Sequence, residues 1–496
     1  MQISVTTAAL ESVSADMLAV GLFEGEALEG ALAAFNQAAG GAIADFLSTG
    51  DFSGKLGQVD ILYPRGLAAK RLLLIGLGKR DAFSAESLRR VAATSAARCK
   101  DVKAKHIAMR LNGDGTSLSA EMRAHVMAEG VLLGTYYFHG QKSSELPPEY
   151  PESVTLVVPD GEQTSATVGV SSGMAYGMAT AAARTWVNLP PNLCTPQYLA
   201  QQAREIAAKF NMKVEVFDKA QLESMKMGAL LGVARGSVIP PQFIVLEHQP
   251  ERAAEGKTVV LVGKGITFDT GGYDIKTADG MLTMKTDMAG AAAVLGAMHA
   301  IGALSVPRHV VALVPTTYNM ISGDAFLPSE VLIASNGLSI EVGNTDAEGR
   351  LILADALVYA ARYKPLAVID LATLTGSMAI ALGTAAAGFY STDSTLTSAL
   401  TAAAESSGDK LWQMPLFQEY EKPLESKVAD TKSTGVRFGG ANIAATFLRK
   451  FTSYPAWAHI DIAGVAFDVP DSPLLPGGGA TGYGVRLLAE YVRRLS

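Results

Sequence analysis

The chain has few cysteines and no long hydrophobic run. Cys99 and Cys194 are the only cysteines in 496 residues, which excludes a framework of disulfides and favours a reducing compartment. No stretch reaches the roughly 20 consecutive apolar residues that a membrane-spanning helix needs. Residues 1–20 contain Glu11 and Asp16, and they lack the basic start and apolar centre of a signal peptide. We therefore expect a cytoplasmic protein that does not cross a membrane.

Basic residues are not in excess either. The chain has 41 Lys and Arg against 48 Asp and Glu, which gives a formal net charge of −7. Proteins that bind nucleic acid or acidic membranes through their overall charge carry a surplus of Lys and Arg. The composition therefore disfavours both as the main partner.

The sequence pattern is typical of an α/β protein. Apolar residues make up 49% of the chain, and no repeat or low-complexity tract interrupts it. Over roughly the first 165 residues, apolar segments typical of strands alternate with helical patterns. Strands are predicted to begin at Met17, Val59, Arg71, His106 and Val154, and helices to span 28–47, 84–99 and 121–137. This alternation predicts a small α/β layer structure.

A second alternating region follows a polar, proline-rich loop at 141–151 and an alanine-rich helical pattern at 171–187. Its predicted helices span 287–304 and 351–363, and its predicted strands begin at Met212, Gln242, Thr258, Val310 and Leu366. The region predicts a larger α/β unit with a mainly parallel central sheet flanked by helices.

Two segments of this second region, 262–287 and 344–351, concentrate charge in apolar surroundings. Among glycine, threonine and apolar neighbours they hold Lys264, Asp269, Lys276, Asp287, Asp346, Glu348 and Arg350. The first segment begins as a buried strand and then breaks at Gly263 and Gly265. Charged side chains just past the end of such a strand lie where open α/β sheets bind ligands.

The four carboxylates in these segments favour a metal site. Carboxylates that converge on one pocket raise each other's pKa unless cations neutralise them. Asp and Glu oxygens suit Zn, Mn, Mg or Co, and two ions about 3.5–4 Å apart can share a carboxylate and a water. Taken singly, however, Asp269 is equally typical of a turn, and Asp287, Asp346 and Glu348 of helix caps or solvated positions.

The order and spacing of these residues are similar to those of a known family. VGKGITFDTGG, KTDMAGAA and NTDAEGRLILADAL resemble the leucyl aminopeptidases, also called cytosol aminopeptidases, which are two-metal exopeptidases. The resemblance runs from about Asn188 to the end and includes WAHIDIAG at 457–464 and GATGYGVR at 479–486. It implies a non-catalytic N-terminal α/β domain at 1–165, a linker helix at 166–187, and a catalytic domain at 188–496. It also implies a hexamer of two stacked trimers.

The resemblance further implies a ligand set for two divalent ions per subunit, Mn or Zn. One ion would be held by Lys264, Asp269, Asp287 and Glu348, and the other by Asp269, Asp346 and Glu348. A lysine ligand must be neutral, and a desolvated site beside two cations would lower its pKa as required. The ions would activate a bridging water and polarise the peptide carbonyl, while the free substrate amine binds one of them.

Two further residues receive catalytic roles from the resemblance. Lys276 would help to stabilise the tetrahedral oxyanion. Arg350 would hold a bicarbonate ion that serves as the base, because its planar fork suits a bidentate oxyanion. A helix that starts just after Arg350 would favour the anion further.

The predicted substrate pocket consists of Met284, Asn344, Thr373, Leu374 and Gly376, although Met and Thr at such positions are also ordinary core residues. An apolar pocket suits leucine-like side chains with broad tolerance. The chain departs from the common family pattern at Thr270, 273–275, Thr277 and Thr286, which affects substrate preference more than reaction class. His459 is interpreted as a buried structural histidine, because the ligand set is complete without it.

Two other functions are compatible with parts of the sequence. A two-metal hydrolase of phosphoesters would need a basic clamp, for which Lys276 and Arg350 are the candidates. An accessory DNA-binding role, which some bacterial relatives combine with peptidase activity, would need a basic stripe and would show salt-dependent DNA retention.

Overall fold

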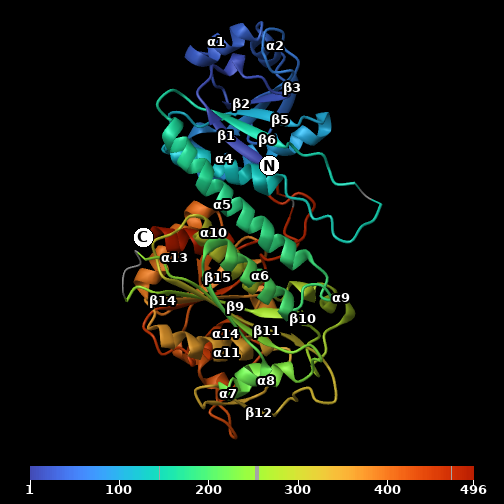
Figure 1. The fold of residues 1–496 in the computed structure, drawn as a ribbon, viewed down its shortest axis with the longest axis vertical. Coiled ribbons are helices and arrows are strands. Elements are labelled where there is room, and N and C mark those ends of the chain that lie inside the picture. The colour runs from blue at the N-terminus through green and yellow to red at the C-terminus, as the bar shows by residue number, and fades with distance from the viewer. Residues whose placement is uncertain (145, 252–255, 471, 496) are drawn as a thin grey trace. The chain divides into compact units, whose positions relative to one another are not determined.

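The chain folds into two compact units (Figure 1). The computed structural model describes residues 1–144, 146–251, 256–470 and 472–495. The first unit comprises Met1–Ala181 and the described part of Asp471–Gly477, and the second comprises Ala182–Pro470 and the described part of Gly478–Ser496. The helix α5 (Gln163–Asn188) begins in the first unit and ends in the second. It is longer than the helical pattern predicted at 171–187.

The first unit is built on a six-stranded sheet in the order β1-β6-β5-β2-β4-β3. Its strands are β1 (Gln2–Thr6), β2 (Met17–Phe23), β3 (Val59–Leu62), β4 (Leu72–Gly78), β5 (His106–Arg110) and β6 (Ser153–Val157). All neighbouring strands are parallel except β3 and β4. Five of these strands are predicted by the sequence, whereas β1 is not, because its alternation of polar and apolar residues is short and partly exposed.

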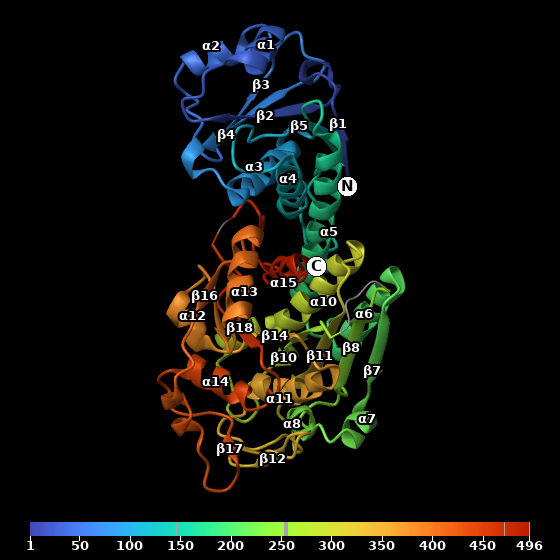
Figure 2. The same ribbon diagram turned by 90° about the vertical axis from the view of Figure 1, so that its left-hand side faces the viewer.

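Helices cover both faces of this sheet, as Figure 2 shows. Alternate residues of β2 and β4 point to opposite faces, so Met17 and Leu73 join the core under α3 (Ala85–Arg98) and α4 (Ala120–Gly134). Leu18 and Leu72 join the core under α1 (Gly30–Ala38) and α2 (Ala42–Ser48). Both faces are therefore apolar along the whole length of β2 and β4.

The single helix predicted at 28–47 is wrong, because the structure has two helices there. The chain turns between α1 and α2 at Gly40 and Gly41, whose φ angles are 69° and 83°. Residues with a Cβ rarely adopt this left-handed conformation, and the helix cannot run through it.

The second unit is built on a nine-stranded sheet in the order β16-β15-β18-β14-β9-β11-β8-β7, with β10 paired to β11. The strands are β7 (Lys213–Phe217), β8 (Gln242–His248), β9 (Val259–Gly263), β10 (Gly265–Asp269), β11 (Val310–Asn319), β14 (Ala367–Ala372), β15 (Ala387–Ser391), β16 (Leu411–Gln413) and β18 (Trp457–Asp461). The central strands β18, β14, β9 and β11 are parallel, and antiparallel pairs occur only toward the edges. The predicted mainly parallel sheet is confirmed.

Helices again cover both faces of the sheet. On one face α10 (Ala289–Ala303) contacts α6 (Pro196–Phe210) and α15 (Val485–Arg494), and α15 contacts α13 (Ser394–Ser407). On the other face α11 (Glu348–Ala360) contacts α8 (Gly228–Ala234) and α14 (Gly440–Arg449). The remaining helices are α7 (Lys219–Ser224), α9 (Ala278–Leu282) and α12 (Gly376–Leu382), and a small sheet joins β12 (Val331–Ile333), β13 (Ser339–Glu341) and β17 (Thr431–Lys432). Among the described residues, no helix is long and apolar enough to cross a membrane.

The buried carboxylate of Asp355 holds α11 in place, and this helix also carries Glu348 and Arg350. Asp355 is fully buried, and its oxygens accept hydrogen bonds from the backbone N–H of Leu230, at 2.9 Å, and of Ser335, at 2.7 Å. Burial raises its pKa to about 6. Asp355→Ala would leave two buried N–H groups without acceptors, so we expect it to lower the free energy of unfolding by about 2–4 kcal/mol in urea titrations. The exposed Asp279→Ala is the control and should cost less than about 0.5 kcal/mol; equal losses would contradict this account.

Candidate active site

A cavity of about 700 Å³ opens in the second unit where the central parallel strands end. Lys264 directly follows β9, Asp269 is the last residue of β10, and Thr373 directly follows β14. Asp287 precedes α10, and Glu348 is the first residue of α11. The predicted strand that breaks at Gly263 and Gly265 is therefore two successive strands, and Lys264 lies between them.

The structure brings all of the sequence-predicted site residues to this one cavity. Its lining includes Lys264, Asp269, Lys276, Met284, Asp287, Asn344, Asp346, Glu348, Arg350, Thr373, Leu374 and Gly376. These residues are up to 112 positions apart in the chain. Their assembly follows from the parallel sheet, which directs the carboxyl ends of its strands to the same edge.

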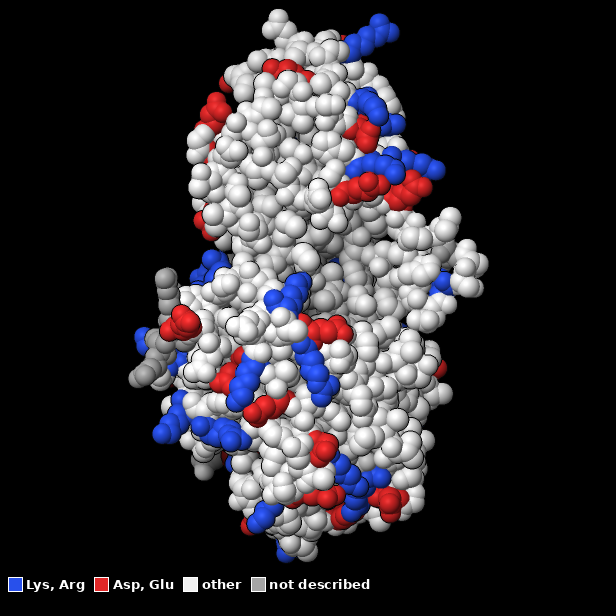
Figure 3. Space-filling model, in the orientation of Figure 1, with Lys and Arg blue, Asp and Glu red and all other residues white. Residues whose placement is uncertain are grey.

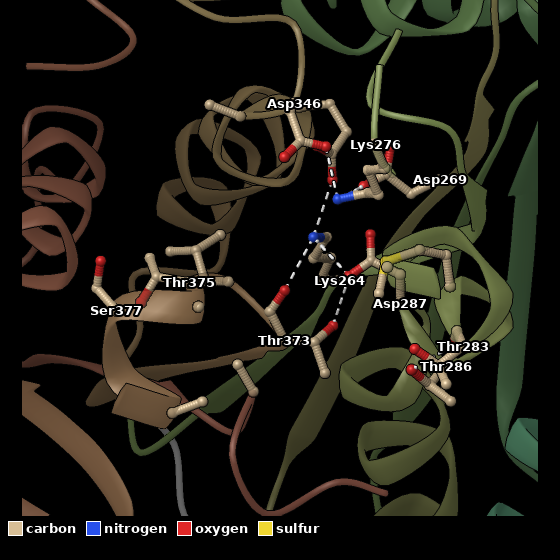
Figure 4. Close-up of a pocket in the computed structure, with 18 of the residues that line it drawn as sticks. Lys264, Asp269, Lys276, Thr283, Thr286, Asp287, Asp346, Thr373, Thr375 and Ser377 are labelled. Carbon is tan, nitrogen blue, oxygen red and sulfur yellow. Dashed lines mark hydrogen bonds and ion pairs between the residues drawn. The ribbon is translucent and has the colours of Figure 1, made fainter. Parts of the chain in front are cut away.

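The charged residues form two neighbouring groups of ion pairs, one around Lys264 and one around Lys276 (Figure 4). The Lys264 Nζ lies 2.8 Å from Asp287 Oδ1 and 2.9 Å from Glu348 Oε1, and it donates to the carbonyl of Thr373 at 3.0 Å. The Lys276 Nζ lies 2.8 Å from Asp269 Oδ2 and 2.5 Å from Asp346 Oδ1. Both ammonium groups thus point into a set of four carboxylates.

Burial sets the protonation of these groups. Loss of water raises the pKa of Asp287 well above its usual value, and it also raises the pKa of Asp269 and of Asp346. Burial alone would lower the pKa of Lys264, but the carboxylates of Asp287, Glu348 and Asp269 raise it above its usual value. The carboxylates by themselves therefore favour a charged Lys264. Lys264 can be neutral, as a metal ligand must be, only if other cations take its place beside these carboxylates.

The donor set fits divalent cations. Oxygens of Asp269, Asp346 and Glu348 all lie within 4.8 Å of one another. Asp287 Oδ2 is buried and has no hydrogen-bond donor among the described residues. Asp269 is oriented by Asn319, whose Nδ2 donates to its Oδ1 at 2.8 Å. Converging carboxylates, oriented from behind by an amide, are the arrangement that hard and borderline cations prefer.

The approach of Lys264 to α11 depends on a glycine. A Cβ at position 349 would lie 2.4 Å from Lys264 Cε and 2.6 Å from its Nζ. These distances are far below van der Waals contact, so Gly349 is needed for Lys264 to reach Glu348.

The helix expected to start just after Arg350, at Leu351, begins three residues earlier, at Glu348. Arg350 therefore lies inside the first turn of α11 rather than before it. Its guanidinium is buried, Nη1 donates to the carbonyl of Ser433 at 2.8 Å, and burial lowers its pKa to about 10. Its Nε has no acceptor among the described residues. A helix N-terminus beside a partly unsatisfied guanidinium favours an anion there.

Two departures from the common family pattern, at Asp274 and Thr277, shape the loop that carries Lys276. Asp274 Oδ2 accepts from the backbone N–H of Thr345 at 2.7 Å, and the Asp274 N–H donates to Thr345 Oγ1 at 2.8 Å. Thr277 caps α9 through the N–H of Gly280, at 3.3 Å. The loop is thereby tied to the residue that precedes Asp346, and Lys276 is held over Asp269 and Asp346.

His459 lies outside the cavity. Its Nδ1 is 2.5 Å from Asp370 Oδ1, and its ring is fully buried on β18. The carboxylate of Asp370 also accepts from the indole of Trp457, at 2.8 Å. This environment agrees with the interpretation of His459 as a structural residue.

Sequence reasoning missed Asp461, which orders two walls of the cavity. This buried carboxylate at the end of β18 accepts from Leu374 N at 3.1 Å, from Thr375 Oγ1 at 2.6 Å and from Ala463 N at 3.2 Å. Its position just inside the end of the WAHID strand was the available signal, since polar groups at strand ends face the ligand edge of such sheets.

Comparison with known proteins agrees with this geometry. Residues 181–489 match the family model described as "Cytosol aminopeptidase family, catalytic domain", and residues 19–145 match the N-terminal domain of the same family. The chain belongs to the cytosol aminopeptidase family. It is 42% identical to a probable cytosol aminopeptidase of Roseiflexus castenholzii over 496 residues, which covers 99% of each chain. It is 44% identical to one from Geobacter sp. over 459 residues, with 92% of each covered.

Two solved structures share the fold. A tomato leucine aminopeptidase mutant superposes with a TM-score of 0.90 at 35% identity, covering 100% of this chain and 96% of that one. A bottromycin maturation enzyme in complex with Mn gives a TM-score of 0.85 at 34% identity, covering 97% and 100%. The resemblance seen in the sequence is confirmed, and the chain is a peptidase that acts on peptides.

Asp461 is expected to matter for peptide hydrolysis without touching the peptide. Asp461→Ala would release the backbone of Leu374 and Thr375, so we expect kcat/KM for leucine p-nitroanilide to fall about 10- to 100-fold. Asp461→Asn keeps one carbonyl oxygen for the N–H groups of Leu374 and Ala463 and should recover most of the loss. If Asp461→Asn is as impaired as Asp461→Ala, hydrogen bonding to this oxygen does not order the walls.

Proposed function

We propose that this cytosol aminopeptidase is metal-dependent and removes leucine-like N-terminal residues from peptides with broad tolerance. The observation that carries the proposal is the set of four carboxylates around two lysines at the ends of β9, β10 and α11. All of this chemistry belongs to a catalytic domain at 188–496, which follows an N-terminal domain at 1–165 and a linker helix at 166–187.

Two divalent ions per subunit, Mn or Zn, would be held by this set. Lys264, Asp269, Asp287 and Glu348 would hold one ion, and Asp269, Asp346 and Glu348 the other. When bound, the ions supply Lewis acidity that polarises a peptide carbonyl and activates water. The mutual approach of the oxygens of Asp269, Asp346 and Glu348 supports this assignment.

The protein's own groups would then orient and stabilise the reacting peptide. The Lys276 ammonium, freed from its carboxylates, would donate to the oxyanion that develops on the carbonyl. The buried Arg350 would hold a bicarbonate ion that takes up a proton, which fits its unsatisfied Nε. Met284, Thr373, Leu374 and Gly376 would line the side-chain pocket, with Asn344 beside the peptide. A free substrate amine as ligand would restrict cleavage to the first residue.

We also propose a cytoplasmic homohexamer, for which light scattering is the direct test. The phosphoester alternative has little support, because both domains match models of a peptidase family. DNA binding has little support on the face drawn in Figure 3, where basic and acidic side chains are interspersed and form no basic stripe.

The test is hydrolysis of leucine p-nitroanilide by chelator-treated protein before and after addition of Mn or Zn. We expect activity only with metal, none with Asp346→Ala, and none on the N-acetylated substrate. Turnover without metal, or cleavage of the N-acetylated substrate, would contradict the proposal.

A further inference from the structure

The cavity extends from the charged group toward two sides (Figure 4). Thr375 and Ser377 lie on one side, and Thr283 and Thr286 on the other. The second side also includes Met284, the residue assigned to the side-chain pocket. Lys285, between these residues, has its Nζ 5.8 Å from the centre of the Phe467 ring. This contact places Phe467 near the turn at 283–286, and Ala466, Phe467 and Asp468 all line the cavity.

Asp468 is the carboxylate on this side. Of the five carboxylates that line the cavity, Asp269, Asp287, Asp346 and Glu348 belong to the charged group, and Asp468 does not. Its side chain is exposed, and it has no ion-pair partner among the residues that the structure describes. The Lys285 ammonium, near the Phe467 ring, donates to the carbonyl of Asn188 at 2.9 Å, and within the described part of the chain it forms no ion pair with Asp468.

The position of Asp468 is fixed by the backbone. Its N–H donates to the carbonyl of Gly479 at 3.0 Å, and its Oδ1 accepts from the Gly479 N–H at 2.8 Å. Its φ of 46° lies in the left-handed region, which aspartate adopts more readily than most residues because its short side chain can hydrogen-bond to nearby backbone. One oxygen of the carboxylate is thus anchored, which holds the charge at the cavity wall.

We propose that Asp468 selects peptides whose N-terminal side chain is long and cationic, lysine or arginine. This inference rests on the proposed function and extends it to a substrate class. The apolar wall of Met284, Ala466 and Phe467 would cover the methylene groups of such a side chain, and its charged end would meet Asp468. Leucine-like residues would use the same wall without the ion pair.

The test compares lysine p-nitroanilide with norleucine p-nitroanilide, because the two side chains have similar length and differ in charge. For the wild-type enzyme we expect kcat/KM to favour lysine. Asp468→Asn should lower the lysine-to-norleucine ratio about three- to tenfold, as expected for a partly exposed ion pair. Asp468→Lys should lower it further, and raising the salt concentration should shrink the wild-type preference.

Asp324→Asn is the matched control, since this exposed aspartate does not line the cavity, and its ratio should equal that of the wild type. An unchanged ratio in Asp468→Asn and Asp468→Lys, with norleucine still cleaved, would overturn the role of Asp468 alone. Absence of turnover on both substrates with metal supplied would instead overturn the proposed function.

Discussion

Lys264→Arg is expected to lower kcat/KM for leucine p-nitroanilide by at least about 10³-fold, which corresponds to about 4 kcal/mol of transition-state stabilisation. Two physical reasons combine. Arginine keeps its proton in proteins and cannot become a neutral ligand. The space beside Lys264 is also closed, since a Cβ at position 349 would already lie 2.6 Å from its Nζ, and a guanidinium is larger than an ammonium.

Lys285→Arg is the matched control for this substitution. Lys285 is two residues from Asp287 and outside the cavity lining, and arginine can still donate to the carbonyl of Asn188. We expect less than about a threefold change in kcat/KM. If Lys264→Arg retains more than a tenth of the wild-type activity, Lys264 is not a ligand.

Asp287→Asn is expected to abolish activity and yet to stabilise the chelator-treated protein. Oδ1 of Asp287 accepts from Lys264 and from Thr373 Oγ1, at 2.8 Å each, and asparagine can keep both bonds. The substitution removes one of four carboxylates that face only two ammonium groups. We expect the free energy of unfolding near neutral pH to rise by about 1–2 kcal/mol, as is common when a strained functional site is relieved.

The pH dependence of this gain follows from the pKa shift of Asp287. Burial raises its pKa in the folded state above the value of 3.8 expected when unfolded. Because the carboxyl pKa is raised, the folded protein binds more protons than the unfolded protein. The cost of ionising Asp287 in the folded state therefore grows as pH rises from the unfolded pKa toward the folded pKa. The advantage of Asn over Asp should therefore be largest at neutral pH and vanish near pH 4. A variant less stable than the wild type at pH 7 would contradict this account.

The sequence was sufficient for the sheet and for the charged group because both depend on local patterns. Val259–Gly263 and Val310–Asn319 are buried along their whole length and read as strands without tertiary information. The spacing of Lys264, Asp269, Asp287, Asp346 and Glu348 matches that of a known family, and this match alone predicts that they lie together. The roles of these residues remain proposals.

Features that depend on non-local contacts could not be predicted. The carboxylate of Asp461 accepts from Leu374 across two neighbouring strands, and Asn319 orients Asp269 from β11. The strand-end position of Asp461 is visible in the sequence, but no local pattern identifies the partner of either residue. The break at Gly41 and the early start of α11 at Glu348 are matters of backbone conformation, which hydrophobic periodicity does not resolve. The role proposed for Asp468 depends on its place on the cavity wall, which the sequence does not predict.

The most direct test of the account is the number of metal ions that the protein binds. Chelator-treated wild-type protein, dialysed against Mn or Zn, should bind two ions per chain by elemental analysis and recover leucine p-nitroanilide hydrolysis in step with them. Glu348→Gln, which changes a residue proposed to hold both ions, should bind fewer than two and remain inactive. Full hydrolysis by wild-type protein that holds no metal would contradict the central claim.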